Sequence, residues 1–344
     1  MRKLITALLC LHALCSSALA MPPEGMVYDL KASVVKVRVA LPNGHSGVGS
    51  GVVVAKDQVV TNCHVIAHAQ AINVIKFGES HRANYIKADW HHDLCIVGFD
   101  GLNTKIAELG SGTSLQYEQP VFTISFPNNS PRPLTTYGLV KALYPMDDAM
   151  IIQTTNDFRM GASGGAMFND DGKLVGIITL KSPGRKAFYY NLPAEWITSL
   201  LLQPELSIPA AGTLPFWDAP EQNRPYFMRV IQPLQTEDWP NLKIIAQQWL
   251  QQEPNTLEAL HYLAIAEYRL NDLENARLHL NQVYTRNNRH ADALFYLGLI
   301  AAQMGNKEFA AHATSLLETL NKDVASQLHA STNSANLNCN LTPC

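Results

Sequence analysis

The sequence has little of what membrane proteins and nucleic-acid-binding proteins need. Beyond the first twenty residues, no stretch approaches the roughly 18 to 20 apolar residues of a transmembrane helix, so we expect no transmembrane segment. Basic residues number 26 against 29 acidic ones and form no cluster, which argues against nucleic acid as a partner. With 47% hydrophobic and 16% charged residues among 344, the composition is that of an ordinary globular chain of two or three domains.

The first twenty residues have the pattern of a secretory signal peptide. Arg2 and Lys3 precede an apolar run at residues 4–14, and residues 16–20 (SSALA) form an A-x-A-like cleavage site. Cleavage after residue 20 would remove two basic groups and lower the formal net charge from −3 to −5. We therefore expect an exported protein.

Cysteine is also scarce, with six in the whole chain. Removal of the expected signal peptide leaves four of them: Cys63, Cys95, Cys339 and Cys344. An even number of cysteines in an exported protein is typical of disulfide bonds. Cys339 and Cys344 enclose four residues and could close a small loop near the C-terminus.

Residues 33–197 consist of short β-rich runs separated by turn residues. The runs include residues 33–39, 51–55, 71–75, 94–99, 120–124 and 174–180. Helical spacing of apolar residues is scarce over this part of the chain. The pattern predicts an all-β barrel or sandwich, and the length suffices for two small barrels.

Three segments of this β-rich part carry residues suited to nucleophilic catalysis. His64 follows an apolar run, Asp93 precedes another, and Ser163 lies among the glycines of residues 161–165 (GASGG). A serine hydroxyl needs a base to take its proton, a histidine can serve as that base near neutral pH, and a carboxylate fixes the histidine tautomer. Glycine lets backbone N–H groups approach a substrate carbonyl. For residues 161–165 alone, an ordinary turn is the alternative.

These segments resemble the three signature blocks of chymotrypsin-fold serine proteases, nearest to the bacterial HtrA/Deg-type peptidases. The blocks are TNCHV at residues 61–65, HDLCIV at residues 92–97 and GASGG at residues 161–165. Further agreement lies at residues 49–54 (GSGVVV) and 190–197 (YNLPAEWI). The resemblance covers about residues 30–200 and implies a trypsin-like double six-stranded β-barrel.

The resemblance assigns a role to each matching position. It implies that Ser163 attacks the substrate carbonyl, that His64 acts first as base and then as acid, and that Asp93 orients His64. The N–H groups of Gly161 and Ser163 would form the oxyanion hole. A triad retained in an enzyme that is no longer active is the alternative.

A zinc site is the competing interpretation of the histidines. It would use His64, His81, His91 and His92, whose spacing fits no familiar metal pattern. We expect His91 and His92 to be exposed loop residues, and we expect no metal and no organic cofactor.

The specificity pocket follows less clearly from the resemblance. In trypsin-like enzymes the residue six before the nucleophile lies at the base of this pocket, and here it is Asp157, which would favour lysine or arginine in the substrate. HtrA-like enzymes usually have a small apolar residue there and prefer small aliphatic side chains. Thr179 and Lys181 belong to the implied pocket, where Arg159 or Lys181 could pair with Asp157 and neutralise it.

The resemblance also bears on two of the cysteines. If His64 and Asp93 touch, Cys63 and Cys95 lie on neighbouring strands and could come within disulfide range. Two buried thiols that pack as small apolar groups are the alternative.

The C-terminal half has a different character. Residues 203–240 are rich in proline and mark a domain boundary. Beyond them the sequence nearly repeats after 34 residues, since residues 257–264 (LEALHYLA) align with residues 291–298 (ADALFYLG). Residues 241–325 resemble tetratricopeptide (TPR) repeats, whose stacked helices bind peptides or partner proteins on a concave face. An unrelated helical bundle is the alternative.

Together these features predict a signal peptide at residues 1–20, a trypsin-like serine protease domain at 21–202, a linker at 203–240, TPR-like repeats at 241–325 and a tail at 326–344. The predicted protein is a serine endopeptidase of the bacterial periplasm or cell exterior. It would hydrolyse protein or peptide substrates through His64, Asp93 and Ser163 and an acyl-enzyme intermediate. The alternative is a latent or non-enzymatic interaction protein that acts through its helical repeats.

Overall fold

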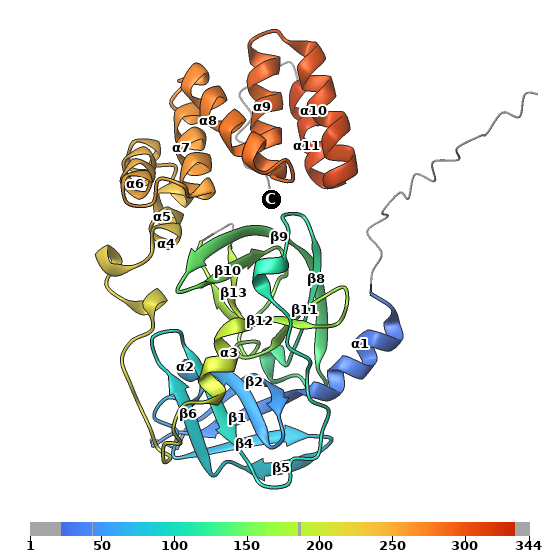
Figure 1. Cartoon of the computed structure of the whole chain (residues 1–344), viewed down its shortest axis with the longest axis vertical. Helices are drawn as coiled ribbons and strands as arrows, with labels where there is room; N and C mark the ends of the chain where they lie inside the picture. Colours follow the sequence, from blue (N-terminus) through green and yellow to red (C-terminus); the bar gives the residue numbers. More distant parts are fainter. Residues whose placement is uncertain (1–21, 43, 185–186, 334–344) are drawn as a thin grey trace, which may run out of the picture.

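The computed structural model describes residues 22–42, 44–184 and 187–333, so the expected signal peptide and Cys339 and Cys344 lie outside the described part. Figure 1 shows three layers along the long axis: a first β-sheet, a second β-structure and a stack of helices. Helix α1 (Glu24–Leu30) leads into the first sheet. Within the described ranges, no helix combines the length and the apolar character needed to span a membrane.

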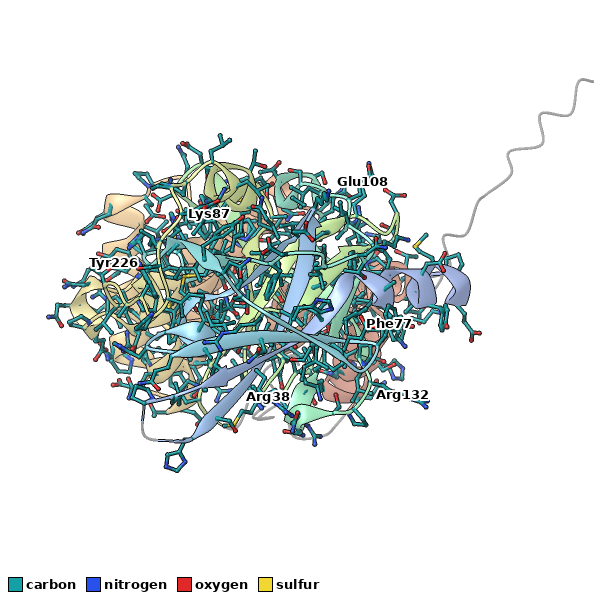
Figure 2. The ribbon with its side chains drawn as sticks, turned by 90° about the horizontal axis from the view of Figure 1, so that it is seen from below. Arg38, Phe77, Lys87, Glu108, Arg132 and Tyr226 are labelled. Atoms are coloured by element: carbon teal, nitrogen blue, oxygen red, sulfur yellow. A yellow bond between two sulfur atoms is a disulfide. The ribbon has the colours of Figure 1, made fainter. Side chains whose placement is uncertain are left out.

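The first sheet has seven antiparallel strands in the order β5-β4-β1-β2-β3-β7-β6, where the resemblance implies a barrel of six. Along β4 the apolar residues alternate, and Ile72 and Val74 are buried on one face. A turn at Phe77 and Gly78, both with positive φ, adds β5 at one edge of the sheet. Figure 2 views the molecule from below and shows Phe77 at the surface, where it is 83% exposed. The strands are β1 (Val34–Ala40), β2 (Ser46–Ala55), β3 (Gln58–Asn62), β4 (Ala71–Lys76), β5 (Glu79–Arg82), β6 (Tyr85–Asp89) and β7 (Leu94–Gly98).

The second β-structure is a closed six-stranded barrel in the order β10-β13-β12-β11-β8-β9. Val121, Val140, Ile152, Met167 and Val175, from five of its strands, pack together as one buried cluster inside it. The adjacent Phe122 and Phe168 belong to the larger core, which includes residues of the first sheet, and their rings stack with centroids 5.6 Å apart. This barrel confirms the trypsin-like β-barrel domain expected from the sequence. The strands are β8 (Pro120–Ser125), β9 (Leu134–Met146), β10 (Ala149–Thr154), β11 (Ala166–Asn169), β12 (Leu174–Lys181) and β13 (Tyr189–Pro193).

The C-terminal region is helical, as the change of period predicts. Helices α7 and α9, and likewise α8 and α10, begin 34 residues apart. Gly298 of α9 permits close packing against α11, because a Cβ atom there would lie 2.6 Å from Leu328. Helix α11 continues past residue 325. The helices after the barrel are α3 (Glu195–Leu201), α4 (Tyr226–Arg229), α5 (Ile231–Gln235), α6 (Trp239–Gln252), α7 (Leu257–Arg269), α8 (Leu273–Arg286), α9 (Ala291–Gln303), α10 (Lys307–Leu320) and α11 (Lys322–Asn333).

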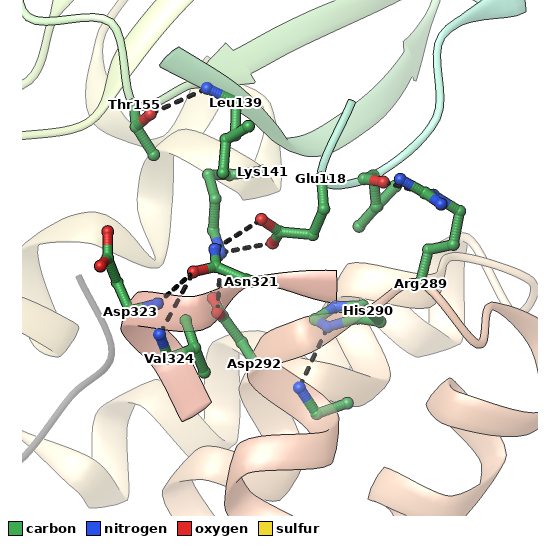
Figure 3. Close-up of polar contacts among 12 residues, drawn as sticks. Glu118, Leu139, Lys141, Thr155, Arg289, His290, Asp292, Asn321, Asp323 and Val324 are labelled. Carbon is green, nitrogen blue, oxygen red and sulfur yellow. Dashed lines mark hydrogen bonds and ion pairs between the residues drawn. The ribbon is translucent and has the colours of Figure 1, made fainter. Parts of the chain in front are cut away.

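A buried ion network joins this helical region to the closed barrel (Figure 3). Lys141 of β9 lies 2.7 Å from Glu118 and 2.9 Å from Asp292, which follows the start of α9. Asn321 donates a hydrogen bond to Glu118 at 2.7 Å. Burial opposes the charge on Lys141, but Asp292 and Glu118 outweigh it and raise the pKa of Lys141 well above its usual value. The helices are therefore held to the barrel by charged contacts as well as by apolar packing.

Candidate active site

His64 and Asp93 meet because strands β3 and β7 pair side by side. His64 lies in the short helix α2 (Cys63–Ile66) directly after β3, and Asp93 ends the turn before β7. His64 Nδ1 is 2.6 Å from Asp93 Oδ2, and the His64 backbone N–H donates to Asp93 Oδ1 at 2.8 Å. The Asp93 side chain is only 1% exposed. A carboxylate at Nδ1 places the proton there and leaves Nε2 free to accept one, as a general base requires.

Two further side chains hold Asp93, and sequence reasoning identified neither. The Asn62 amide donates to the Asp93 carbonyl oxygen at 3.0 Å and to the Thr179 hydroxyl at 2.9 Å. The Trp217 indole N–H donates to Asp93 Oδ2 at 3.1 Å. Asn62 lies inside the TNCHV block, which could have pointed to it. Trp217 belongs to the linker at residues 203–240. Its position as an aromatic residue among prolines was the only feature of the sequence that could have pointed to it.

Ser163 lies between β10 and β11 and lines the same hollow as His64. This hollow measures about 540 Å³ and also includes Met160 and Gly161. The Ser163 hydroxyl donates to the carbonyl oxygen of Thr179 at 3.4 Å, which is long for a hydrogen bond. Over the described ranges the hydroxyl has no hydrogen bond to His64. The structure thus brings the three expected residues to one site, without a hydrogen bond between Ser163 and His64.

Gly161 and Ser163 both line this hollow. Asn128 N–H binds the Met160 carbonyl at 2.7 Å, and because the carbonyl and N–H of a trans peptide point in opposite directions, the Gly161 N–H points away from Asn128. Within residues 22–42, 44–184 and 187–333, neither the Gly161 nor the Ser163 N–H has a hydrogen-bond partner. Gly161 has a φ of +89°, and a Cβ atom there would lie 2.9 Å from the Phe126 carbonyl oxygen. The loop therefore requires glycine and presents two free donors.

Ser50 fixes this loop from the first sheet. Its hydroxyl donates to the Gly161 carbonyl at 2.8 Å and accepts from the Phe126 N–H at 2.8 Å. Ser50 N–H also binds the Ser163 carbonyl at 2.8 Å. The residue lies in the GSGVVV segment, so the sequence marked its neighbourhood without indicating this role.

Of the expected specificity residues, Asp157 and Lys181 both contact Tyr189, and Thr179 contacts Asn62. Asp157 is exposed and accepts a hydrogen bond from the Tyr189 hydroxyl at 3.2 Å. Burial and the nearby Asp157 charge raise the pKa of Tyr189. Lys181 places its amine 5.5 Å from the Tyr189 ring centroid, and the hydroxyl of Thr179 is engaged with Asn62 and the Ile177 carbonyl. No ion pair between Asp157 and a basic residue occurs in the described part of the chain.

Cys63 and Cys95 form a disulfide. Their Cα atoms lie 4.9 Å apart, because Cys63 follows β3 and Cys95 belongs to the neighbouring β7. Of the two alternatives left open by the sequence, the structure has the bridge. It joins the segments that carry His64 and Asp93.

Of the histidines in the zinc interpretation, His64 lies beside Asp93 and His81 beside Glu79. His92 lies beside Asp89 and Asp147, and the exposed His91 is 3.9 Å from the same Asp147. The expectation that His92 is an exposed loop residue is wrong. Its side chain is 15% exposed, both ring nitrogens contact carboxylates at 2.6 and 2.9 Å, and its ring centroid lies 3.8 Å from that of Trp196. His92 thereby ties the turn before Asp93 to the β9–β10 turn.

Two groups of side chains in the described ranges have the spacing of metal ligands: His91, His92 and Asp147, and the buried set Glu258, His261 and His290. In the first group, both nitrogens of His92 are already engaged. In the second, His290 Nδ1 accepts from the Ala293 N–H at 3.1 Å, so the ring proton lies on Nε2, 3.3 Å from Glu258. A metal at Nε2 would have to displace that proton. A histidine that binds a metal through one nitrogen normally donates a hydrogen bond from the other, whereas Nδ1 of His290 accepts one. We assign no metal to either group.

Comparison with known proteins agrees with this geometry. Residues 49–177 match the family model of the trypsin-like peptidase domain. A probable periplasmic serine endoprotease DegP-like of Halomonas elongata is 30% identical over 165 residues, which cover 44% of this chain and 35% of that protein. The serine protease Do-like HtrB of Bacillus subtilis is 30% identical over 175 residues, which cover 45% and 38%. The chain thus spans just over a third of the length of these curated relatives.

A solved structure supports the fold alone. The active form of the Rv3671c protease from M. tuberculosis superposes with a TM-score of 0.50 at 19% identity, covering 57% of this chain and 92% of that one. Residues 49–177 are therefore similar to trypsin-like peptidase domains, and the curated relatives of this part of the chain include HtrA/DegP-like serine proteases.

Proposed function

We propose that the chain is a serine endopeptidase in which His64, Asp93 and Ser163 act as a catalytic triad. The observation that carries the proposal is the hollow shared by His64, Ser163 and the free N–H of Gly161, with Asp93 bound to the far side of His64. A base, a nucleophile and two oxyanion donors at one surface are what acyl transfer requires.

The reaction follows from these positions. Ser163 Oγ attacks the peptide carbonyl while His64 Nε2 takes its proton, and buried Asp93 stabilises the imidazolium that forms. The N–H groups of Gly161 and Ser163 hold the oxyanion. His64 then returns the proton to the leaving amine, and water hydrolyses the acyl-Ser163 intermediate by the same steps.

Labelling with a fluorophosphonate probe tests the triad in the full-length protein. The probe should label the wild type, the Ser163→Ala variant should show none, and His64→Ala should label at least about a thousandfold more slowly. Ser326→Ala and His81→Ala remove the same side chains elsewhere and should label normally. Equal labelling of wild type and Ser163→Ala would refute the assignment of the nucleophile.

For the specificity pocket we propose Asp157, Thr179 and Lys181. The Asp157 carboxylate has no ion pair in the described part of the chain, which supports a preference for lysine or arginine in the substrate, because a pocket charge can act only when it is not neutralised. The Asp157→Asn variant should lower kcat/KM for an arginine peptide about fivefold and leave a valine peptide nearly unchanged. If the wild type cleaves the valine peptide faster than the arginine peptide, the proposed basic specificity is wrong and the protein shares the aliphatic preference of HtrA-like enzymes.

A latent enzyme is the second candidate. It is favoured by the Ser163 hydroxyl, which binds the Thr179 carbonyl instead of His64. In that case the fluorophosphonate probe labels the wild-type protein slowly when no peptide is present. Labelling becomes faster once a peptide occupies the hollow. The measurement is the labelling rate with and without an unfolded protein substrate.

We propose that residues 241–325 are TPR-like repeats whose first role is to brace the peptidase domain. The interval of 34 residues between α7 and α9 supports the repeat assignment. Bracing is supported by contacts from both helices to the barrel, such as Glu258 with the Tyr117 hydroxyl at 2.6 Å and Asp292 with Lys141. A protein partner would bind on the faces that these contacts leave open.

We also propose that the protein is exported to the periplasm or the cell exterior. The signal-like residues 1–20 and the disulfide between Cys63 and Cys95 support this location, because disulfides persist in oxidising compartments. Fractionation of cells that produce the full chain, with mass determination of its N-terminus, tests both export and cleavage after residue 20.

A further inference from the structure

The proline-rich linker runs along the first sheet as a docked segment. Leu206 and Ile86 exchange two backbone hydrogen bonds, of 2.7 and 3.0 Å. Gly212 lies against the Trp90 indole so closely that a Cβ atom would be 2.1 Å from the ring. Phe216 N–H then binds the His91 carbonyl at 3.0 Å, two residues before Asp93. These contacts carry the chain back to the active site after the barrel is complete.

At this point the short helix η4 (Phe216–Asp218) presents Trp217 to the triad. Its indole N–H reaches Asp93 Oδ2, the same oxygen that binds His64 Nδ1. Its ring also meets the His64 ring edge-on, with centroids 5.6 Å apart and an interplanar angle of 88°. One linker side chain therefore contacts both the acid and the base.

We propose that Trp217 is a positioning residue of the active site and that the catalytic unit extends through the linker to at least residue 218. The inference rests on the proposed endopeptidase function. An indole N–H is a donor that does not titrate, so it can fix the Asp93 carboxylate in every protonation state of His64. The edge-on ring restricts rotation of the His64 imidazole and keeps its Nδ1 at Asp93. Trp217 thus acts through Asp93 and His64, without touching the substrate.

The segment that carries Trp217 is anchored beyond the site as well. Phe216 is buried, and its ring centroid lies 6.4 Å from that of Phe227 in α4. Phe227 in turn stacks on Tyr144 of the barrel at 4.6 Å. The position of Trp217 is therefore set by packing on the sheet, on the barrel and on the start of the helical region.

The test compares Trp217→Phe with Trp249→Phe in the full-length protein. Both changes keep an aromatic ring and remove one indole–carboxylate hydrogen bond, since Trp249 donates to Glu253 at 2.9 Å in α6. For Trp217→Phe we expect kcat on a peptide substrate to fall about tenfold, with KM within about twofold of wild type. For Trp249→Phe we expect both constants to remain near wild type.

A second readout needs no activity. The proton between His64 Nδ1 and Asp93 gives a downfield proton NMR resonance, identified by its loss in His64→Ala. Trp217→Phe should shift this resonance, and Trp249→Phe should leave it in place. An unshifted resonance together with wild-type kcat would overturn the inference. If the wild type shows neither labelling nor cleavage, the proposed function fails, and the resonance alone then decides whether Trp217 positions the pair.

Discussion

Replacement of Lys141 by methionine should remove one of the strongest links between the helical region and the barrel. The Lys141 side chain is 8% exposed, and its partners Glu118 and Asp292 are 1% and 21% exposed. Methionine keeps the aliphatic volume, so the main loss is electrostatic. Loss of one member of a buried ion pair costs about 3–5 kcal/mol. We expect about 3 kcal/mol, because Asn321 still donates to Glu118 and Asp292 is partly solvated.

The chain offers a matched control for this change. Lys173 pairs with Glu108 at 2.8 Å, nearly the same distance, but the two side chains are 44% and 73% exposed. Lys173→Met should therefore leave the free energy of unfolding close to that of the wild type. Urea unfolding followed by tryptophan fluorescence measures both variants.

Equal losses for Lys141→Met and Lys173→Met would refute the argument that burial gives the Lys141 pair its strength. A second variant tests the mechanism. In the Lys141→Met background, Glu118→Gln removes the charge that has lost its partner, so it should restore part of the lost stability. A further loss in the double variant would show that the cost comes from packing.

Three further predictions follow from the structure. Burial opposes protonation of His92, but its contacts with two aspartates outweigh burial and raise its pKa. The stabilisation by His92 is therefore complete at low pH and is lost as the pH rises through this pKa. The difference in Tm between wild type and His92→Gln, measured from pH 5 to 9, should be smallest at the alkaline end. Burial lowers the pKa of His261 to about 4, so the free energy of unfolding should fall by up to about 3 kcal/mol between pH 6.5 and 4. Urea unfolding at several pH values should show a smaller decrease over this range for His261→Gln. Gly161→Ala should slow probe labelling about a hundredfold while far-UV circular dichroism stays unchanged, because its Cβ would meet the Phe126 carbonyl and shift an oxyanion donor.

The sequence predicts the residues whose roles depend on local motifs. His64, Asp93 and Ser163 each lie beside a strand in a short recognisable block, so their order and surroundings are visible in the chain. Trp217 is not predictable in this way, because its contact with Asp93 spans 124 residues and depends on how the linker docks. A proline-rich composition indicates a boundary and says nothing of where the segment packs.

The same reasoning explains two other differences. The seventh strand of the first sheet arises from a four-residue strand, β5, with mostly exposed side chains that gives no apolar alternation. His92 is polar and follows another histidine, so the sequence suggests an exposed loop, whereas the tertiary fold places it against Trp196 and two acids. Side chains that bridge distant segments are invisible to periodicity and motif alike.

The ion network around Lys141 has a consequence for the order in which the chain matures. Synthesis proceeds from the N-terminus, so the barrel strands emerge long before Asp292 and Asn321, which follow their partners by 151 and 203 residues. Until the helices arrive, Lys141 and Glu118 have only each other and the barrel face that they occupy is open to water. The nascent barrel is therefore incomplete on this face, and the arrival of α9 and of Asn321 sets the moment at which this face finishes folding.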